Sequence, residues 1–153
     1  MKYRKTIVIT AIVMIAGFIL LKKDLWDKNE ELLRKQVLSI GQKVETINLA
    51  DVTPFEWDTV YSFGPYTSKE DIYETVGYKW DNIQETMNED MDQIVFLNDG
   101  KVVCYIYGYP TNKGYSIFYL GETVSEFASV LKLEDDLQFQ VKRENEVVYL
   151  KKE

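Results

Sequence analysis

The stretch from Phe55 to Ile72, FEWDTVYSFGPYTSKEDI, constrains the fold most, because it predicts a strand, a turn and a helix start in direct succession. Aromatic and β-branched residues alternate with polar ones in its first half, which is typical of a half-buried strand. Gly64-Pro65 ends that strand. The segment Thr67–Asp71 contains a capping box, so we expect a short helix that ends near Gly77.

One part of this stretch is specific enough to resemble a known family. The pattern Trp57-Asp58-x-Val60-Tyr61-x-Phe63-x-Pro65-Tyr66-Thr67-Ser68, followed by an acidic helix, is similar to a largely uncharacterised family of small extracytoplasmic domains of Gram-positive bacteria. Many members are lipoproteins or single-pass anchored proteins. The resemblance covers roughly residues 48–153 and implies a location and a fold more than an activity. This chain departs from the lipoprotein members, because it has no cysteine at the anchor position.

The N-terminal end contains an uncharged run, Thr6–Leu21, with basic residues on both sides. As a helix the run would span about 24 Å, which is short of a hydrocarbon core of about 30 Å. Flanking lysines and Trp26 would extend it. A cleaved signal peptide is the alternative, but Ala16-Gly17-Phe18 is a poor cleavage site. We therefore expect residues 1–23 to be an uncleaved signal anchor and transmembrane helix.

The basic residues around this run point to opposite orientations. Lys2, Arg4 and Lys5 favour a cytoplasmic N-terminus, whereas a literal count of the lysines and arginines in residues 22–35 favours the reverse. Long domains, however, are translocated largely regardless of charge. We expect a short cytoplasmic tail, a single membrane span and an extracytoplasmic C-terminal domain.

The chain beyond this run is acidic. The whole sequence has 18 basic and 25 acidic residues, and without Lys2, Arg4 and Lys5 the remainder has 15 against 25, a formal charge of −10. Such a surface repels nucleic acid and anionic lipid headgroups. The single cysteine, Cys104, cannot form an internal disulfide, and its apolar neighbours predict a buried small side chain.

Residues 24–48 contain no proline and carry Trp26, Leu33, Ile40 and Ile47 at a spacing of seven. We expect a juxtamembrane amphipathic helix over 24–48, with Gly41 as its weakest point. Two roles are open for this helix. It packs on the sheet of its own domain, or it self-associates as a stalk and makes the protein a homo-oligomer.

Residues 49–153 are expected to form one α+β domain, with a mostly antiparallel sheet of five or six strands and two or three helices on one face. Asn98-Asp99-Gly100 predicts a hairpin. The strand that follows it, Lys101–Tyr109, is apolar on both faces and is expected at the centre of the sheet. Tyr115–Leu120 is expected as the third strand of this meander.

The end of the domain is expected to form a helix and a second hairpin. Thr123 and Glu126 match a capping box, which predicts a helix over Val124–Leu133. Residues 137–143 and 147–152 alternate in polarity around a turn at Glu144-Asn145-Glu146. Their charges favour a place at a sheet edge.

The residues that most enzymes use are scarce in this sequence. There is no histidine, one cysteine and no glycine-rich phosphate-binding motif, so we expect no catalytic residues, cofactor or metal site. The acidic run around Asn88 offers oxygens of the kind calcium binds, but its spacing matches no EF-hand, and a solvated face is expected; its members are Glu85, Glu89, Asp90 and Asp92. A glycan hydrolase that uses only carboxylates would have to draw on Glu56, Asp58 or Asp81, and no pattern selects these three.

Tyrosine is the remaining signal, with eleven residues in the chain. Tyr66, Tyr105, Tyr107 and Tyr109 are the candidate partner-binding residues, because Tyr is enriched at interfaces. The alternative is that the tyrosines fill a sheet face beneath a helix. The sequence therefore predicts a membrane-anchored extracytoplasmic binding or accessory domain that recognises a protein partner. A self-associating stalk and a carboxylate-only glycan hydrolase are the alternatives.

Overall fold

The computed structural model describes residues 24–152. These residues form four helices: α2 Leu25–Leu38, α3 Leu49–Val52, α4 Lys69–Val76 and α5 Pro110–Lys113. They also form nine strands: β1 Thr46–Asn48, β2 Thr59–Phe63, β3 Asp92–Asn98, β4 Lys101–Gly108, β5 Tyr115–Tyr119, β6 Glu122–Ser125, β7 Ala128–Lys132, β8 Gln138–Glu144 and β9 Val147–Lys152.

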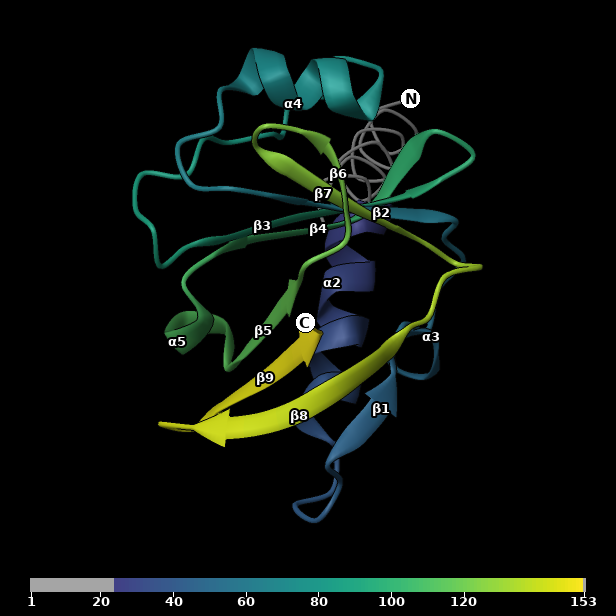
Figure 1. Ribbon diagram of the computed structural model, residues 1–153, viewed down its shortest axis with the longest axis vertical. Coiled ribbons are helices and arrows are strands. Elements are labelled where there is room, and N and C mark those ends of the chain that lie inside the picture. The colour runs from purple at the N-terminus through teal and green to yellow at the C-terminus, as the bar shows by residue number, and fades with distance from the viewer. Residues whose placement is uncertain (1–23, 153) are drawn as a thin grey trace, which may run out of the picture.

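The strands make two sheets rather than the single sheet that was predicted. One has four strands in the order β1-β8-β9-β5, and the other has five in the order β4-β3-β2-β7-β6. All pairings are antiparallel except that of β5 with β9. In Figure 1 the five-stranded sheet crosses the middle of the molecule, between the four-stranded sheet below and α4 above. The predicted α+β class is confirmed.

Two hydrophobic cores fill the spaces between these layers. The first lies between the sheets and is closed by α2 and α3, with Phe96, Tyr115 and Phe139 among its largest side chains. The second lies on the opposite face of the five-stranded sheet, beneath α4 and the connection over residues 77–91. The five-stranded sheet is therefore apolar on both faces.

Helix α2 packs on its own domain, one of the two roles predicted for it. Leu33 and Val37 are fully buried in the first core. The Asn29 side-chain amide donates a hydrogen bond to the carbonyl of Val103, the extra residue of a β-bulge in β4. Strand β4 ends the five-stranded sheet instead of lying at its centre, and α2 packs against it.

The predicted helix over 24–48 is too long. It ends at Leu38, Gly41 lies in the connection that follows, and Thr46–Asn48 pair with β8 as a strand. Residues 24–48 are thus part of the same folded unit as the rest. Among residues 24–152, no helix is long and apolar enough to cross a membrane. The predicted signal anchor, residues 1–23, lies outside the described residues.

The central stretch folds largely as expected. The Ser68 hydroxyl accepts a hydrogen bond from the Asp71 backbone N–H and caps α4, which ends at Gly77 in the left-handed conformation. Strand β2 is shorter than predicted and begins at Thr59. Trp57 precedes it, lies in the first core, and donates from its indole N–H to the Thr53 hydroxyl.

The predicted helix over Val124–Leu133 is wrong, because this segment is the β6–β7 hairpin. Strand β7 lies between β2 and β6, and its hydrogen bonds satisfy the backbone groups along the edge of β2. Strand β5 does not continue the meander, because it leaves the five-stranded sheet and pairs with β9. The last hairpin lies inside the four-stranded sheet rather than at its edge.

Candidate functional site

Two of the four candidate tyrosines lie beneath the connection over residues 77–91. Tyr105 is 5% exposed, and its hydroxyl accepts hydrogen bonds from the Gln84 backbone N–H and the Gln93 side-chain amide. Burial raises the pKa of Tyr105 to about 12. Tyr107 stacks on it and donates from its hydroxyl to the Glu85 carbonyl. Tyr105 is therefore a core residue rather than a binding residue, as the sheet-filling alternative predicted.

The other two candidates are exposed and belong to different connections of the chain. Tyr109 precedes α5 and is 38% exposed. Tyr66 is 64% exposed and has a φ of 63°, a conformation that L-residues other than glycine seldom adopt. Its backbone N–H donates to the hydroxyl of Thr86, which is itself buried. The fold thus exposes the ring of Tyr66 to solvent and holds the backbone of this residue in a strained conformation.

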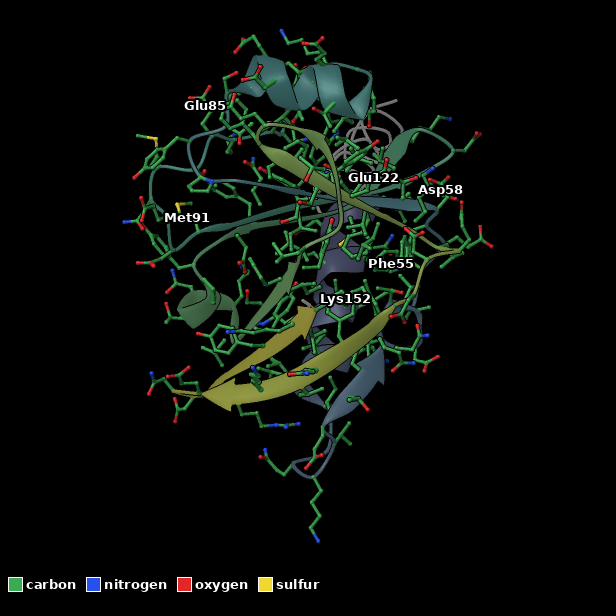
Figure 2. All side chains as sticks on the ribbon, viewed as in Figure 1. Phe55, Asp58, Glu85, Met91, Glu122 and Lys152 are labelled. Atoms are coloured by element: carbon green, nitrogen blue, oxygen red, sulfur yellow. The ribbon has the colours of Figure 1, made fainter. Side chains whose placement is uncertain are left out.

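A groove of about 460 Å³ begins directly beside Tyr66, at Gly64-Pro65. We call it the β5 groove. It is lined by residues 62–65 at the end of β2, by Glu89, by 91–94 at the start of β3, by 117–120 in and after β5, and by Thr123 and 125–129 in the β6–β7 hairpin. Figure 1 shows β5 and this hairpin on either side of the connection between the sheets, and Figure 2 shows Met91 just before the start of β3.

The rim of the β5 groove is apolar and exposed. Phe118 is 48% exposed, Leu120 64% and Phe127 44%. Phe118 lies in β5, Leu120 follows β5 at the start of the crossing to the other sheet, and Phe127 lies at the tip of the β6–β7 hairpin. Large exposed apolar side chains that gather around a hollow are typical of an interaction site.

One edge of β5 is unpaired in the part of the chain that the structure describes, but the residues along it are buried, since Ile117 and Tyr119 are each 2% exposed. Gly114 and Leu120 both form backbone hydrogen bonds to β9, so the backbone groups of even-numbered residues in β5 face that strand. The N–H and C=O groups of Ile117 and Tyr119 point the opposite way, since neighbouring residues of a strand alternate. Within residues 24–152, no strand pairs with that side of β5.

The charges of the β5 groove have one sign. Glu89, Asp92 and Glu126 line it, and among the described residues no Lys or Arg does. A second hollow of about 400 Å³, between α4 and the same hairpin, shares Glu126 and Phe127 with the groove. Asp71 and Glu74 also line this second hollow, and among the described residues no basic side chain does.

One of these carboxylates, Asp92, is held in place by hydrogen bonds from two side chains. Asp92 accepts hydrogen bonds from the Ser116 hydroxyl at 2.9 Å and from the Lys113 ammonium at 3.0 Å. Burial raises the pKa of Asp92 and lowers that of Lys113, while the attraction between the two opposes both changes. Lys113 also donates to the Gly108 carbonyl. This ion pair joins β3, β4, α5 and β5, so its main effect is structural.

The other carboxylates weighed from the sequence form no comparable site. Glu56, Asp58 and Asp81 do not line the β5 groove, and Asp58 accepts a hydrogen bond from the Asp99 backbone N–H. Among residues 24–152, no three carboxylate or thiol side chains are placed to hold a metal ion together. Cys104 is fully buried, as predicted, and burial raises the pKa of its thiol.

Sequence reasoning missed the rim residues Phe118, Leu120 and Phe127. A signal for the first two was present, because alternation in YSIFYL separates Tyr115, Ile117 and Tyr119 from the residues between them. Phe127 lies within Val124–Leu133, which was predicted to be a helix and forms the β6–β7 hairpin instead. Comparisons of the chain with family models, with curated proteins and with solved structures found no match.

Proposed function

We propose that this protein is a membrane-anchored extracytoplasmic binding or accessory domain, and that the β5 groove is where it binds a protein partner. The observation that carries the proposal is the β5 groove itself, which has the exposed side chains of Phe118, Leu120 and Phe127 at its rim. Large exposed apolar side chains that surround a hollow are a feature by which proteins bind one another.

Several observations support a binding role over the alternatives. Tyr66 follows Pro65, which lines the groove, and its exposed ring would offer a partner a stiff aromatic contact next to that residue. The apolar face of α2, which would hold a stalk together, is buried in the protein's own first core. The anchor itself rests on the Thr6–Leu21 run and on the resemblance to extracytoplasmic domains.

The test compares two lysine substitutions in the tagged full chain, isolated with detergent from membranes of the cells that make it. Leu120→Lys changes the groove rim, and Leu133→Lys changes a residue of similar character outside the groove, 47% exposed. We expect one protein to be isolated with the wild type and with Leu133→Lys, and to be lost with Leu120→Lys. A partner retained by Leu120→Lys contradicts the proposal, provided that both variants keep the wild-type melting temperature.

A further inference from the structure

The start of α2 carries exposed apolar side chains beside a tryptophan from a distant part of the chain. We infer that Leu25, Trp26 and Trp80, which we call the tryptophan patch, dock on the lipid headgroup layer of the membrane that anchors the protein. Docking of this kind rests on the membrane anchor of the proposed function. It adds a second surface to the protein, because none of the three residues lines the β5 groove.

The two tryptophans are held together by direct contact between their rings. The ring centroids of Trp26 and Trp80 are 5.3 Å apart and the ring planes meet at 86°, an edge-to-face arrangement that aromatic pairs favour. Both rings also pack against Tyr105, at centroid distances of 6.3 and 5.3 Å. Because Tyr105 is buried in the second core, both tryptophans have fixed positions on the folded domain.

The tryptophan patch is partly exposed to water. Leu25 is 61% exposed, and Trp26 and Trp80 are only partly buried where they pack against the second core. Removal of such apolar surface from water contributes about 25 cal/mol per Å². Tryptophan is also enriched at membrane–water interfaces, where its ring lies at the level of the headgroups. The composition of the patch therefore suits contact with lipid headgroups.

The position of the patch in the chain brings it close to the membrane. The uncharged run of the proposed anchor ends at Leu21, and the five residues from Lys22 to Trp26 reach at most about 18 Å even when fully extended. Trp80 has no such link through the sequence, and its contact with Trp26 brings it to the same place. Trp80 is therefore the residue whose position tests the docking.

The charge of the protein indicates how this surface binds. Beyond residue 21 the formal charge is −10, which an anionic lipid surface repels. Burial of aromatic and aliphatic side chains among headgroups does not depend on lipid charge. Docking through the tryptophan patch is therefore expected on a zwitterionic membrane, with no need for anionic lipid.

Docking would also fix the position of the β5 groove relative to the membrane. The connection over residues 77–91 contains Trp80 near its start and lines the groove with Glu89 and Met91 at its end. Two tyrosine hydroxyls from β4 hold this connection on the sheet through hydrogen bonds to its backbone. A partner in the groove would therefore meet the domain at a defined height above the lipid surface.

Tryptophan fluorescence tests the docking, because the third tryptophan, Trp57, is a control inside the protein. It is 4% exposed and lies in the first core. The full chain is reconstituted into phosphatidylcholine vesicles, with or without bromine on the acyl chains next to the headgroup, which quenches tryptophans that contact lipid. Trp26→Phe retains Trp57 and Trp80, and the double variant Trp26→Phe/Trp80→Phe retains only Trp57.

We expect brominated lipid to quench the emission of Trp26→Phe several-fold more than that of the double variant. Such a difference would place Trp80 at the lipid, because Trp57 emits in both variants. Equal quenching of the two folded variants overturns the inference.

A second measurement leaves all three tryptophans in place. Lys79→Cys, beside Trp80, and Lys142→Cys, on β8, introduce cysteines at exposed positions for a nitroxide label, while the native Cys104 is fully buried. In vesicles, a water-soluble nickel complex should relax the label at position 79 several-fold less than the label at position 142. Equal relaxation at the two positions would contradict docking even if the tryptophan variants do not fold.

Failure of the docking is distinguishable from failure of the proposed function. If the wild-type chain does not float with the vesicles in a density gradient, the membrane anchor is wrong and the docking is wrong with it. If the chain floats but Trp80 is not quenched, the anchor stands and only the docking is wrong.

Discussion

Tyr66 is the residue at which strain and exposure coincide. Its φ is 63°, and among the described residues three other non-glycine residues also have a positive φ: Asp99, Asn145 and Glu146. Those three lie in hairpin turns, where such values are usual. Tyr66 lies instead between a strand and a helix cap, and its ring is 64% exposed. Strain at an exposed aromatic residue is a reason to look for a function there.

Replacing Tyr66 separates stability from binding. Tyr66→Gly should raise the free energy of unfolding by about 0.5 kcal/mol, because relief of about 1 to 2 kcal/mol of left-handed strain exceeds the entropic cost of glycine. Tyr66→Ala keeps the strain and should leave stability nearly unchanged. Chemical denaturation checks both values, and both variants should bind the partner more weakly. Full partner binding by both would remove Tyr66 from the site.

Asp92 and Lys113 form the most buried ion pair among the described salt bridges, with side chains 15% and 12% exposed. Lys113→Met leaves a carboxylate buried without its cation and should cost about 3 to 5 kcal/mol at neutral pH. The double variant with Asp92→Asn removes the charge as well and should recover most of that loss. Thermal unfolding of the three proteins makes this comparison.

The pH dependence of Lys113→Met has a definite sign. Burial already raises the pKa of Asp92, and loss of the lysine raises it further. A carboxyl whose folded pKa lies above its unfolded value of about 3.9 favours folding most below that value, and this advantage is lost as pH rises through the folded pKa. The melting temperature of the single variant, taken as its difference from that of the double variant, should therefore be higher at pH 5 than at pH 7. A parallel pH profile for both would contradict this account.

At the scale of elements, the local signals in the sequence were the reliable ones. The Ser68 cap, the left-handed end of α4 at Gly77 and the two hairpin turns formed where predicted, because each depends on a few neighbouring residues. The segment Val124–Leu133 has helical spacing and an apparent cap, yet forms β6 and β7. Its partner, β2, lies far away in the sequence, and pairing with it outweighed local preference.

The two hairpin turns have similar φ values but different residues at the second position, which allows a matched test. Asp99-Gly100 has φ values of 50° and 69°, and Asn145-Glu146 has 48° and 66°. Glycine suits the second position of such a turn, and glutamate does not. Glu146→Gly should raise the free energy of unfolding by about 1 kcal/mol, and Gly100→Ala should lower it by a similar amount. Urea denaturation of both variants checks this, and changes of the same sign would contradict it.

At the scale of the whole molecule, the β5 groove exists because the chain passes from one sheet to the other after β5. No local pattern showed that Tyr115–Tyr119 would pair in parallel with β9, near the end of the chain. The groove brings together the end of β2, the start of β3 and the β6–β7 hairpin. Sequence reasoning found Tyr66 beside it, but not the groove itself, because contacts between distant segments create it.

Gly121 makes this crossing possible. A Cβ at this position would clash with the backbone carbonyl of Val130 and crowd the ring of Tyr119. Gly121→Ala should lower the free energy of unfolding by about 1 to 3 kcal/mol, as overpacking does, and should weaken partner binding by displacing the hairpin. Gly41→Ala, which meets only ordinary side-chain contact, is the matched control. Denaturation curves that coincide for the two variants would contradict the claim that the chain is tightly packed at Gly121.

The central claim is that a protein partner binds at the β5 groove. Site-specific photocrosslinking from position 118, in the full chain in its native membrane, tests it most directly, with position 133 as the exposed control outside the groove. We predict one discrete crosslinked partner from position 118 and none from position 133. The same crosslinked products from both positions, or none from position 118, would contradict the claim.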